Sequence, residues 1–522
     1  MVFRIEVLIR CAVAYLVLPP LIFLAGWVRV EVALPCIVLS VISFVLFMRQ
    51  APCADGDVSL PGHGLDGREV RLSAGTLVFL VAALLGWCVL CGQGGFVCQK
   101  GDWCARNALF RDLLTHEWPV MYPQVNGALC YYIGHWLPAA VVGKSVLHVS
   151  DSVELAWRIG NVALVLWTFI GVLIVLSLLA VMWKSSSFHE VLSLVVAVLF
   201  FGGLDVVGYL ISQGLAVASG GDFSWAGMTH LDNRWARGFE FSSNTTQLSW
   251  VFNQCVPGWL ATCAVLASRD LRIIGIILAP LVVCAPFPLI GIGLLVVIVS
   301  LPIVRNLKWR FIKEVSSTVN ILGAVGMAFV PMVYLSSNGG SGAIELCRKW
   351  TSATPFWYAL FLFLEVGILL MCLDAEDRKN VWCRASCLLL TVLPVIYLGG
   401  GRDFGMRATI PSLFVLMIMF MKRLRNCRSW WACLYLVVAS VGPIGEVASS
   451  VSTTFRMWST YADSRRTWGV WPDFHAYSDN GTYDRPREEL DKMWKWHVYF
   501  AMKPIDAVFY SSFARRGANR DE

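Results

Sequence analysis

Three charged residues in one polar stretch have the types and placement to do chemistry. Asp102 opens the stretch, Asp112 lies inside it, and Lys144 closes it. A carboxylate can take the proton of an attacking hydroxyl group, and a lysine can neutralise a phosphate. The apolar spacing of residues 104–114 predicts a short helix on a membrane surface. Asp102 then either caps the start of that helix or directs its carboxylate into a cleft, and both interpretations stay open.

Five arginines are candidates for binding an anion, since a planar guanidinium group can donate two parallel hydrogen bonds. They are Arg158, Arg234, Arg237, Arg402 and Arg407. All five are predicted on one side of the membrane, where they can converge on a single group. Extension of the side chain to the membrane interface explains Arg234 and Arg237 equally well. For the cluster formed by Arg402, Asp403 and Arg407 we favour a functional role, because it flanks a turn at the mouth of an apolar run.

A second polar group lies in the middle of the chain. Asp205 follows two glycines within an apolar run. An acidic side chain in such a run is costly in free energy, so it indicates a functional site by default. The glycines indicate a broken or closely packed helix, so a buried structural hydrogen bond is the alternative. Farther along, His230 and Asp232 offer two ligands for a divalent cation beside Asp102. No third ligand has a defined spacing, so a metal requirement stays open.

The elements that position these residues follow from composition. The chain has 522 residues, of which 57% are hydrophobic and only 15% charged. A soluble domain carries roughly 25% charged residues, so a water-facing, disordered or coiled-coil protein is excluded. Apolar runs long enough to cross a bilayer predict an all-α polytopic membrane protein with about 13 transmembrane helices. The runs are 7–28, 32–48, 74–94, 155–183, 190–218, 248–267, 273–285, 288–304, 315–336, 355–373, 382–399, 407–421 and 430–447.

The distribution of Lys and Arg sets the predicted orientation. Basic residues concentrate at 305–310 and 422–425, which places these segments and the N-terminus in the cytoplasm. Residues 273–304 then form a hairpin with both ends on that side. A transmembrane module at 1–447 precedes a tail at 448–522, which we expect to be a small extracytoplasmic cap. The other outside segments are a first loop at 95–154, in which Cys98 and Cys104 can pair, and a second loop at 219–247.

The order of features in the first loop resembles that of the GT-C superfamily of integral-membrane glycosyltransferases. The similarity is to the protein O-mannosyltransferase and aminoarabinose-transferase branch, and later stretches resemble uncharacterised bacterial membrane proteins of this organisation. The matching features, in order, are Asp102, the 104–114 helix, Trp118-Pro119-Val120, Tyr131-Tyr132, Gly143-Lys144, and Glu154 with Arg158. Two features of that branch are missing: Asp102 is followed by Trp103 instead of a second acid, and no His-Pro-Pro precedes the tyrosines.

The resemblance implies a GT-C-like bundle in the cytoplasmic membrane. It also implies transfer of a sugar from a polyprenyl-phosphate donor to a hydroxyl of a glycan, lipid or protein acceptor outside, with inversion. Asp102 would be the catalytic base, and the arginines with Lys144 would bind the lipid phosphate. Asp112, Asp205, His230, Asp232 and Asp403 would support them. No nucleic-acid-binding pattern is present.

Two other functions remain open on the sequence alone. One is a transporter or flippase of lipid-linked glycans, a class that typically shows inverted repeats and interrupted helices. The other is a polysaccharide polymerase or ligase, whose key basic residues would lie in the 219–247 and 400–407 regions.

Overall fold

A computed structural model describes most of the chain. The described residues are 1–52, 59–62, 64–99, 102–122, 127–224, 235–337, 344–347, 350–398, 403–425, 429–461, 503–504 and 507–515. Within them, nine helices are long and apolar enough to cross a membrane, and three shorter apolar helices accompany them. The prediction of an all-α polytopic membrane protein is confirmed in this form. The predicted number of about 13 spans is not confirmed.

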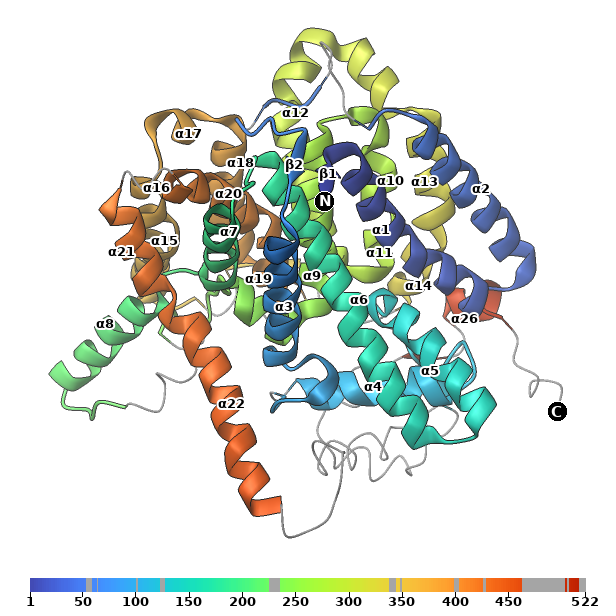
Figure 1. The fold of residues 1–522 in the computed structure, drawn as a ribbon, viewed down its shortest axis with the longest axis horizontal. Coiled ribbons are helices and arrows are strands. Elements are labelled where there is room, and N and C mark those ends of the chain that lie inside the picture. The colour runs from blue at the N-terminus through green and yellow to red at the C-terminus, as the bar shows by residue number, and fades with distance from the viewer. Residues whose placement is uncertain are drawn as a thin grey trace.

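The chain starts at one end of the bundle, called here the N-terminal face (Figure 1). Strand β1 (Val2–Arg4) pairs antiparallel with β2 (Glu69–Arg71). Backbone hydrogen bonds join Gly67 N–H to the Met182 carbonyl and Leu60 N–H to the Arg269 carbonyl, at 3.2 and 2.9 Å. Asn380 donates to the Gly62 carbonyl at 3.0 Å. Segments that the topology predicted on one side of the membrane therefore meet on one face of the molecule.

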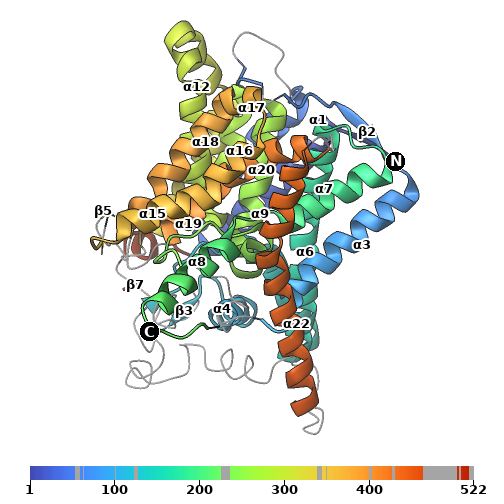
Figure 2. The same cartoon turned by 90° about the vertical axis from the view of Figure 1, so that its left-hand side faces the viewer.

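The first loop lies at the other end, called here the loop face. Helices α1 (Ile5–Trp27), α2 (Val30–Arg49), α3 (Ala74–Leu90) and α6 (Val153–Met182) run between the two faces, and α4 (Trp103–Thr115) and α5 (Leu137–Ser150) lie across the loop face. Figure 2 shows α4 end-on beneath the bundle. Strand β4 (Gly127–Ala128) pairs with both β3 (Met121–Tyr122) and β7 (Lys503–Pro504). The end of the chain therefore shares a face with the first loop, as predicted. Which face meets the cytoplasm stays a prediction.

The apolar run predicted at 190–218 is two helices. Helix α7 (Phe188–Phe200) ends before Phe201, and α8 (Asp205–Ala218) begins at Asp205. Gly202 and Gly203 lie in the interruption between the two helices. A side chain at position 203 would collide with the carboxylate of Glu365, so only glycine fits there. The broken helix expected around Asp205 is therefore present.

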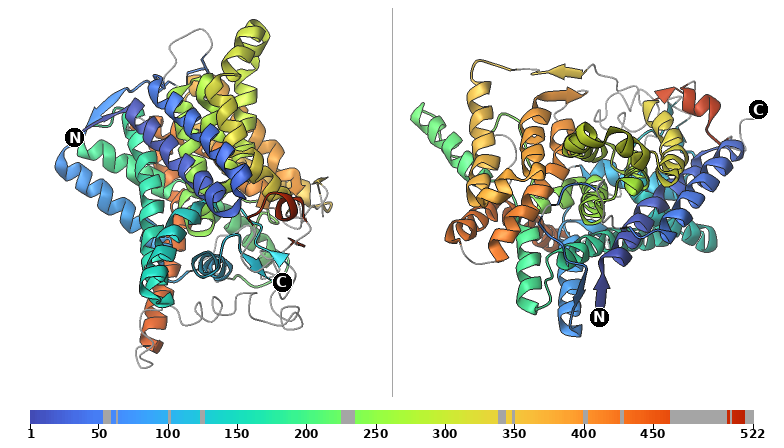
Figure 3. Two further views of the ribbon diagram at one scale, coloured as in Figure 1. Left: turned by 90° about the vertical axis from the view of Figure 1, so that its right-hand side faces the viewer. Right: turned by 90° about the horizontal axis from the view of Figure 1, so that it is seen from above.

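Helix α9 (Asn244–Ser268) lies near the middle of the bundle in the view from above (Figure 3) and is almost entirely buried. Its backbone departs from helical geometry at Val251. After it come the turn η5 (Leu271–Ile273), α10 (Ile274–Leu278), α11 (Leu281–Cys284), α12 (Pro286–Val315), α13 (Thr318–Met327) and α14 (Phe329–Ser336). Ser317 donates to the Arg272 carbonyl at 2.5 Å, so the chain returns to the face from which α10 started. The predicted hairpin therefore has both ends on the N-terminal face.

The last third of the described chain adds helices around α9. They are α15 (Thr354–Leu362), a π-turn η6 (Phe363–Gly367), α16 (Ile368–Cys372), α17 (Ala375–Lys379), α18 (Val381–Val392), α19 (Asp403–Ala408), α20 (Ile410–Arg425), α21 (Trp430–Ala439), α22 (Val441–Tyr461) and α26 (Val508–Ser512). Strand β5 (Ile344–Leu346) pairs with β6 (Ile396–Leu398), which follows the turn η7 (Leu393–Val395). Helix α22 continues past residue 447, where the tail was predicted to begin. Most of the predicted cap, 462–502, lies outside the described residues.

Candidate functional site

Helix α4 confirms the helix predicted after Asp102, but its apolar side chains are covered by protein. The Trp103 indole donates to the Ser249 carbonyl at 2.8 Å, and its ring stacks on Phe252 with centroids 4.8 Å apart. Phe110 and Leu113 are fully buried. The helix is therefore anchored on α9, which fixes the direction of its polar residues.

Asp102 precedes the first turn of α4 without capping it. Its side chain accepts no hydrogen bond from the backbone of that turn and instead pairs with the Arg106 guanidinium at 3.2 Å. The Arg106 side chain is only 4% exposed, whereas that of Asp102 is 29% exposed. Asp102 thus holds a buried cation in place while its carboxylate stays accessible.

Helix α19 repeats this arrangement on another segment of the loop face. Asp403 and Arg407 are also four residues apart and pair at 3.2 Å, with the arginine 9% and the aspartate 56% exposed. Arg407 donates a hydrogen bond to the Tyr132 hydroxyl. Its guanidinium carbon lies 5.9 Å from the ring centres of both Tyr132 and Phe287. Aromatic faces stabilise a cation that has lost water, so Arg407 is held charged inside the protein.

Two adjacent tyrosines connect these ion pairs. The Tyr131 hydroxyl donates to that of Tyr132, and their ring centres are 3.7 Å apart. Burial, and then the neighbouring Tyr132, raise the pKa of Tyr131, whereas the charges of Arg407 and Arg106 act in the opposite direction. Both arginines are therefore within electrostatic range of one phenol.

We call these residues the two-arginine site. It consists of Asp102, Arg106, Tyr131, Tyr132, Asp403 and Arg407. Each arginine can form charge-assisted hydrogen bonds to an anion, and each has an accessible carboxylate beside it.

A cavity of about 260 Å³ adjoins the site. Asp403, Gly405 and Met406 of α19 line it together with Phe239 and Glu240, which lie in the second predicted loop. The Ser242 hydroxyl donates to Glu240. The second loop thus reaches α19, and two carboxyl groups, those of Asp403 and Glu240, border one hollow of the loop face.

Three of the predicted phosphate ligands have other surroundings. Arg158 pairs with Glu154 at the exposed start of α6. Lys144 donates to the His116 carbonyl at 2.5 Å and lies 5.4 Å from the Trp118 ring centre, and burial lowers its pKa against the opposing effect of Glu117. Arg237 is exposed and lies 5.8 Å from the Trp357 ring centre.

The remaining predicted residues divide into two groups. Asp112 is buried on α4, 4.0 Å from the His116 imidazole, and Asp205 accepts a hydrogen bond from the Trp235 indole at 2.9 Å. Arg234, Arg402, His230, Asp232 and the side chain of Cys104 lie outside the described residues. In the part of the chain that the structure describes, no three His, Cys, Asp or Glu side chains are grouped as a metal site would require.

Sequence reasoning missed Arg106 and gave the tyrosines no role of their own. A signal was present: the spacing Asp-x-x-x-Arg occurs at 102–106, 374–378 and 403–407, and of these only the first and third were predicted on the outer side. On a helix this spacing brings the two side chains together. Comparing the two segments would have singled out Arg106 as the counterpart of Arg407.

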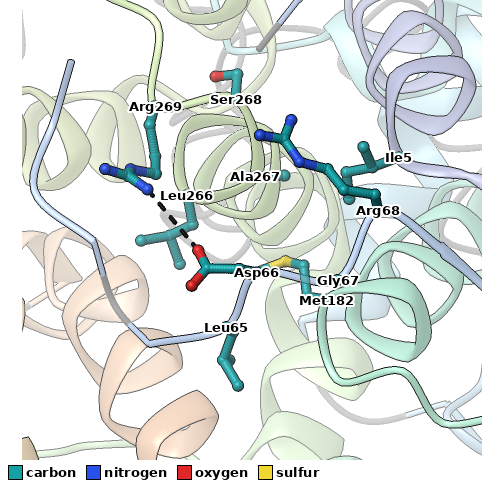
Figure 4. A pocket seen from close by; sticks show the side chains of 10 residues that line it. All are labelled: Ile5, Leu65, Asp66, Gly67, Arg68, Met182, Leu266, Ala267, Ser268 and Arg269. Carbon is teal, nitrogen blue, oxygen red and sulfur yellow. Dashed lines mark ion pairs between the residues drawn. The ribbon is translucent and has the colours of Figure 1, made fainter. Parts of the chain in front are cut away.

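The N-terminal face has a hollow of a different kind. Figure 4 shows Arg269 and Asp66 turned toward one another, with Arg68 on the other side of the opening. The ion pair measures 3.8 Å, and the cavity has a volume of about 30 Å³. This volume suits a water molecule and is far too small for a sugar.

Comparison with known proteins identifies no relative. No protein-family model, no curated protein and no solved structure matches this chain.

Proposed function

We propose that this chain is an integral-membrane glycosyltransferase. It moves a sugar from a polyprenyl-phosphate carrier to an acceptor hydroxyl group on the outer side of the cytoplasmic membrane. The observation that carries the proposal is the two-arginine site, in which two almost fully buried arginines both act electrostatically on Tyr131 and each pairs with an accessible aspartate. Beyond its pair with Asp102, Arg106 keeps a buried side-chain nitrogen, Nη1, without a hydrogen-bond partner, and this supports an anionic ligand beside it.

The reaction follows from the groups available. The acceptor oxygen forms a bond to the anomeric carbon from the side opposite the phosphate, which inverts that carbon. The bond between this carbon and the phosphate oxygen breaks, and its electron pair leaves with the lipid phosphate. Arg106 and Arg407 stabilise the charge that develops there. The proton of the acceptor hydroxyl passes to the carboxylate of Asp102.

The proposal is tested by measuring release of undecaprenyl phosphate. The purified chain in lipid nanodiscs is given a panel of undecaprenyl-phosphate-linked hexoses and pentoses, together with a membrane extract as the source of acceptors. We expect release from at least one donor, reduced about 100-fold or more by Asp102→Asn, the size typical of losing a general base. The variant Arg272→Gln, on the N-terminal face, is the matched control and should keep full activity.

One result would refute the proposal, and another would reassign its catalytic base. No release from any donor would remove the transferase assignment. Release that is unchanged in Asp102→Asn but abolished in Asp403→Asn would keep the transferase and move the base to α19, beside the 260 Å³ cavity.

Transport of a lipid-linked glycan is a second candidate, with one observation in its favour. The α7–α8 segment is interrupted at 201–204, and the α11–α12 hairpin turns at Ala285. Interrupted helices are common around the substrate sites of transporters. Reconstituted vesicles carrying a fluorescent lipid-linked sugar would show transbilayer movement without release of lipid phosphate if this alternative holds.

A further inference from the structure

The half of α9 nearer the loop face carries buried polar side-chain atoms that form no hydrogen bond within the fold. The side-chain nitrogen of Asn253 is buried without a hydrogen-bond partner, and so are the nitrogen and the oxygen of the Gln254 amide. Both residues are at most 2% exposed. Buried polar side chains are almost always hydrogen-bonded in native proteins, so each exception needs an explanation.

Two neighbouring side chains show the same feature. Arg106 Nη1 and His135 Nδ1 are also buried without a hydrogen-bond partner. Both side chains lie on Phe252, the residue before Asn253, at 5.9 Å from its ring centre for Arg106 and 5.4 Å for His135. These five unsatisfied atoms therefore lie around one turn of α9, directly after its irregular residue Val251.

The helix geometry relates this turn to the two-arginine site. Gly258 lies one turn beyond Gln254 and faces Pro288 of α12 and Ile410 of α20. A Cβ atom added at position 258 would lie 3.0 Å from Pro288 and 3.8 Å from Ile410. Residues four apart share a helix face, so Gln254 faces the same two helices, one turn nearer the loop face. Phe287 adjoins Pro288 in α12, and Arg407 lies three residues before Ile410. The Arg407 guanidinium lies 5.9 Å from the ring centres of both Phe287 and Tyr132.

The chemistry of the free atoms suits a hydroxylated ligand. The Asn253 and Gln254 amides supply N–H donors and one carbonyl acceptor. Burial lowers the pKa of His135 to about 3, so its ring is neutral near pH 7. Because its Nε2 contacts Thr168 at 3.1 Å, Nδ1 is the ring atom left for a further partner. A sugar presents hydroxyl groups that donate and accept, and it can satisfy both kinds of atom.

We propose that Asn253 and Gln254 bind the sugar of the lipid-linked ligand while Arg106 and Arg407 bind its phosphate. This assignment rests on the proposed function. It makes the turn after Val251 the part of the site that distinguishes a sugar-bearing lipid from the bare lipid phosphate.

The test uses variants that remove the amides without leaving a hole. Gln254→Leu and Asn253→Leu are compared with Asn244→Leu on the same helix, where the amide donates to the Val198 carbonyl at 2.9 Å. Thermal unfolding is measured for each purified chain in nanodiscs, first without ligand. We expect Asn244→Leu to lower the melting temperature. Gln254→Leu and Asn253→Leu should leave it unchanged or raise it, because neither amide has a protein partner to lose.

The same samples are then titrated with undecaprenyl phosphate and with undecaprenyl-phosphate-linked sugars. The wild type should bind the best sugar-bearing lipid at least 10-fold more tightly than undecaprenyl phosphate. Gln254→Leu and Asn253→Leu should bind undecaprenyl phosphate normally and lose most of that preference. A melting temperature lowered as in Asn244→Leu, or a preference kept in full, would overturn the assignment.

The wild type itself separates this inference from the proposed function. If undecaprenyl phosphate binds but no sugar strengthens binding, the role of Asn253 and Gln254 is wrong and the phosphate site stands. If neither kind of lipid binds, the proposed function and this assignment both fail.

Discussion

Two ion pairs of the N-terminal face and the two pairs of the two-arginine site are built in opposite senses. In these two pairs of the N-terminal face the carboxylate is buried and the cation is exposed, with Asp270 at 2% and Arg272 at 43%, and Asp377 at 6% and Lys422 at 36%. In the two-arginine site the arginines are buried, and their aspartates face outward. The pairs have similar lengths, so the difference lies in which partner the protein covers.

This difference separates a structural use of charge from a binding use. Asp270 accepts from both the backbone N–H and the guanidinium of Arg272, at 2.9 Å each, and so holds a turn together. A buried carboxylate of this kind offers nothing to a ligand. A buried arginine beside an accessible carboxylate keeps positive potential inside the fold, where low polarity strengthens its effect on an anion.

The largest effect is expected from removing a buried arginine. Arg407→Gln should reduce release of undecaprenyl phosphate about 100-fold, or roughly 3 kcal/mol, because a charge-assisted contact to the leaving phosphate is lost. Initial rates in nanodiscs measure this. Arg272→Gln, which removes an exposed cation of the N-terminal face, should change the rate less than 2-fold. Equal losses of activity in the two variants would refute the functional distinction between the two faces.

The stability of the two faces should respond in the opposite order. Asp270→Ala should lower the free energy of unfolding by roughly 2 kcal/mol, because buried hydrogen-bond donors at the turn lose their acceptor. Asp403→Ala should cost less than about 1 kcal/mol, since solvent screens its carboxylate and Arg407 keeps its contacts with Tyr132. Denaturant unfolding in detergent micelles compares them. If Asp403→Ala proves the more damaging, the exposed aspartates are structural.

A pH dependence of stability is expected from the loop face. The pKa of His135 is about 3 in the folded protein, against an ordinary value of 6.5. Below pH 6.5 the unfolded chain binds a proton that the folded chain does not, so stability falls as the pH is lowered through this window and is constant above it. Between pH 7 and 5.5 the loss should be about 1 kcal/mol.

His135→Gln provides the check on this slope. It keeps a neutral, hydrogen-bonding side chain and should flatten the dependence of the melting temperature on pH. His148→Gln, at an exposed position of α5, should leave the slope as it is in the wild type. A slope that survives His135→Gln would assign the pH dependence to other groups.

Much of the fold could be predicted because it depends on local patterns in the sequence. The glycines before Asp205 indicated the break between α7 and α8, and basic residues at both ends of 273–304 indicated the hairpin. The apolar spacing of 104–114 indicated α4. Each of these predictions depends on neighbours within about 30 residues, where hydrophobic periodicity and charge distribution determine the outcome.

The candidate site was less accessible, because its contacts are distant in the chain. Arg106 is buried by α9 through Phe252, and Arg407 meets Tyr132 across 275 positions. No local pattern indicates that α9 passes beside α4, or that Phe287 lies next to both Tyr132 and Arg407. The resemblance to the GT-C first loop directed attention to Asp102 and Arg158, and the structure leaves these two residues in different surroundings.

Arg158 therefore gives the smallest expected effect and the clearest test of burial against position. It lies on the loop face, and the resemblance assigns it to the lipid phosphate, yet its side chain is 41% exposed and pairs with Glu154. An exposed pair on a helix contributes only about 0.3–0.5 kcal/mol. Arg158→Gln should thus leave the melting temperature nearly unchanged and the rate of undecaprenyl phosphate release within 2-fold of the wild type. A loss as large as that of Arg407→Gln would show that the phosphate is held at the start of α6, and burial would no longer identify the functional arginines.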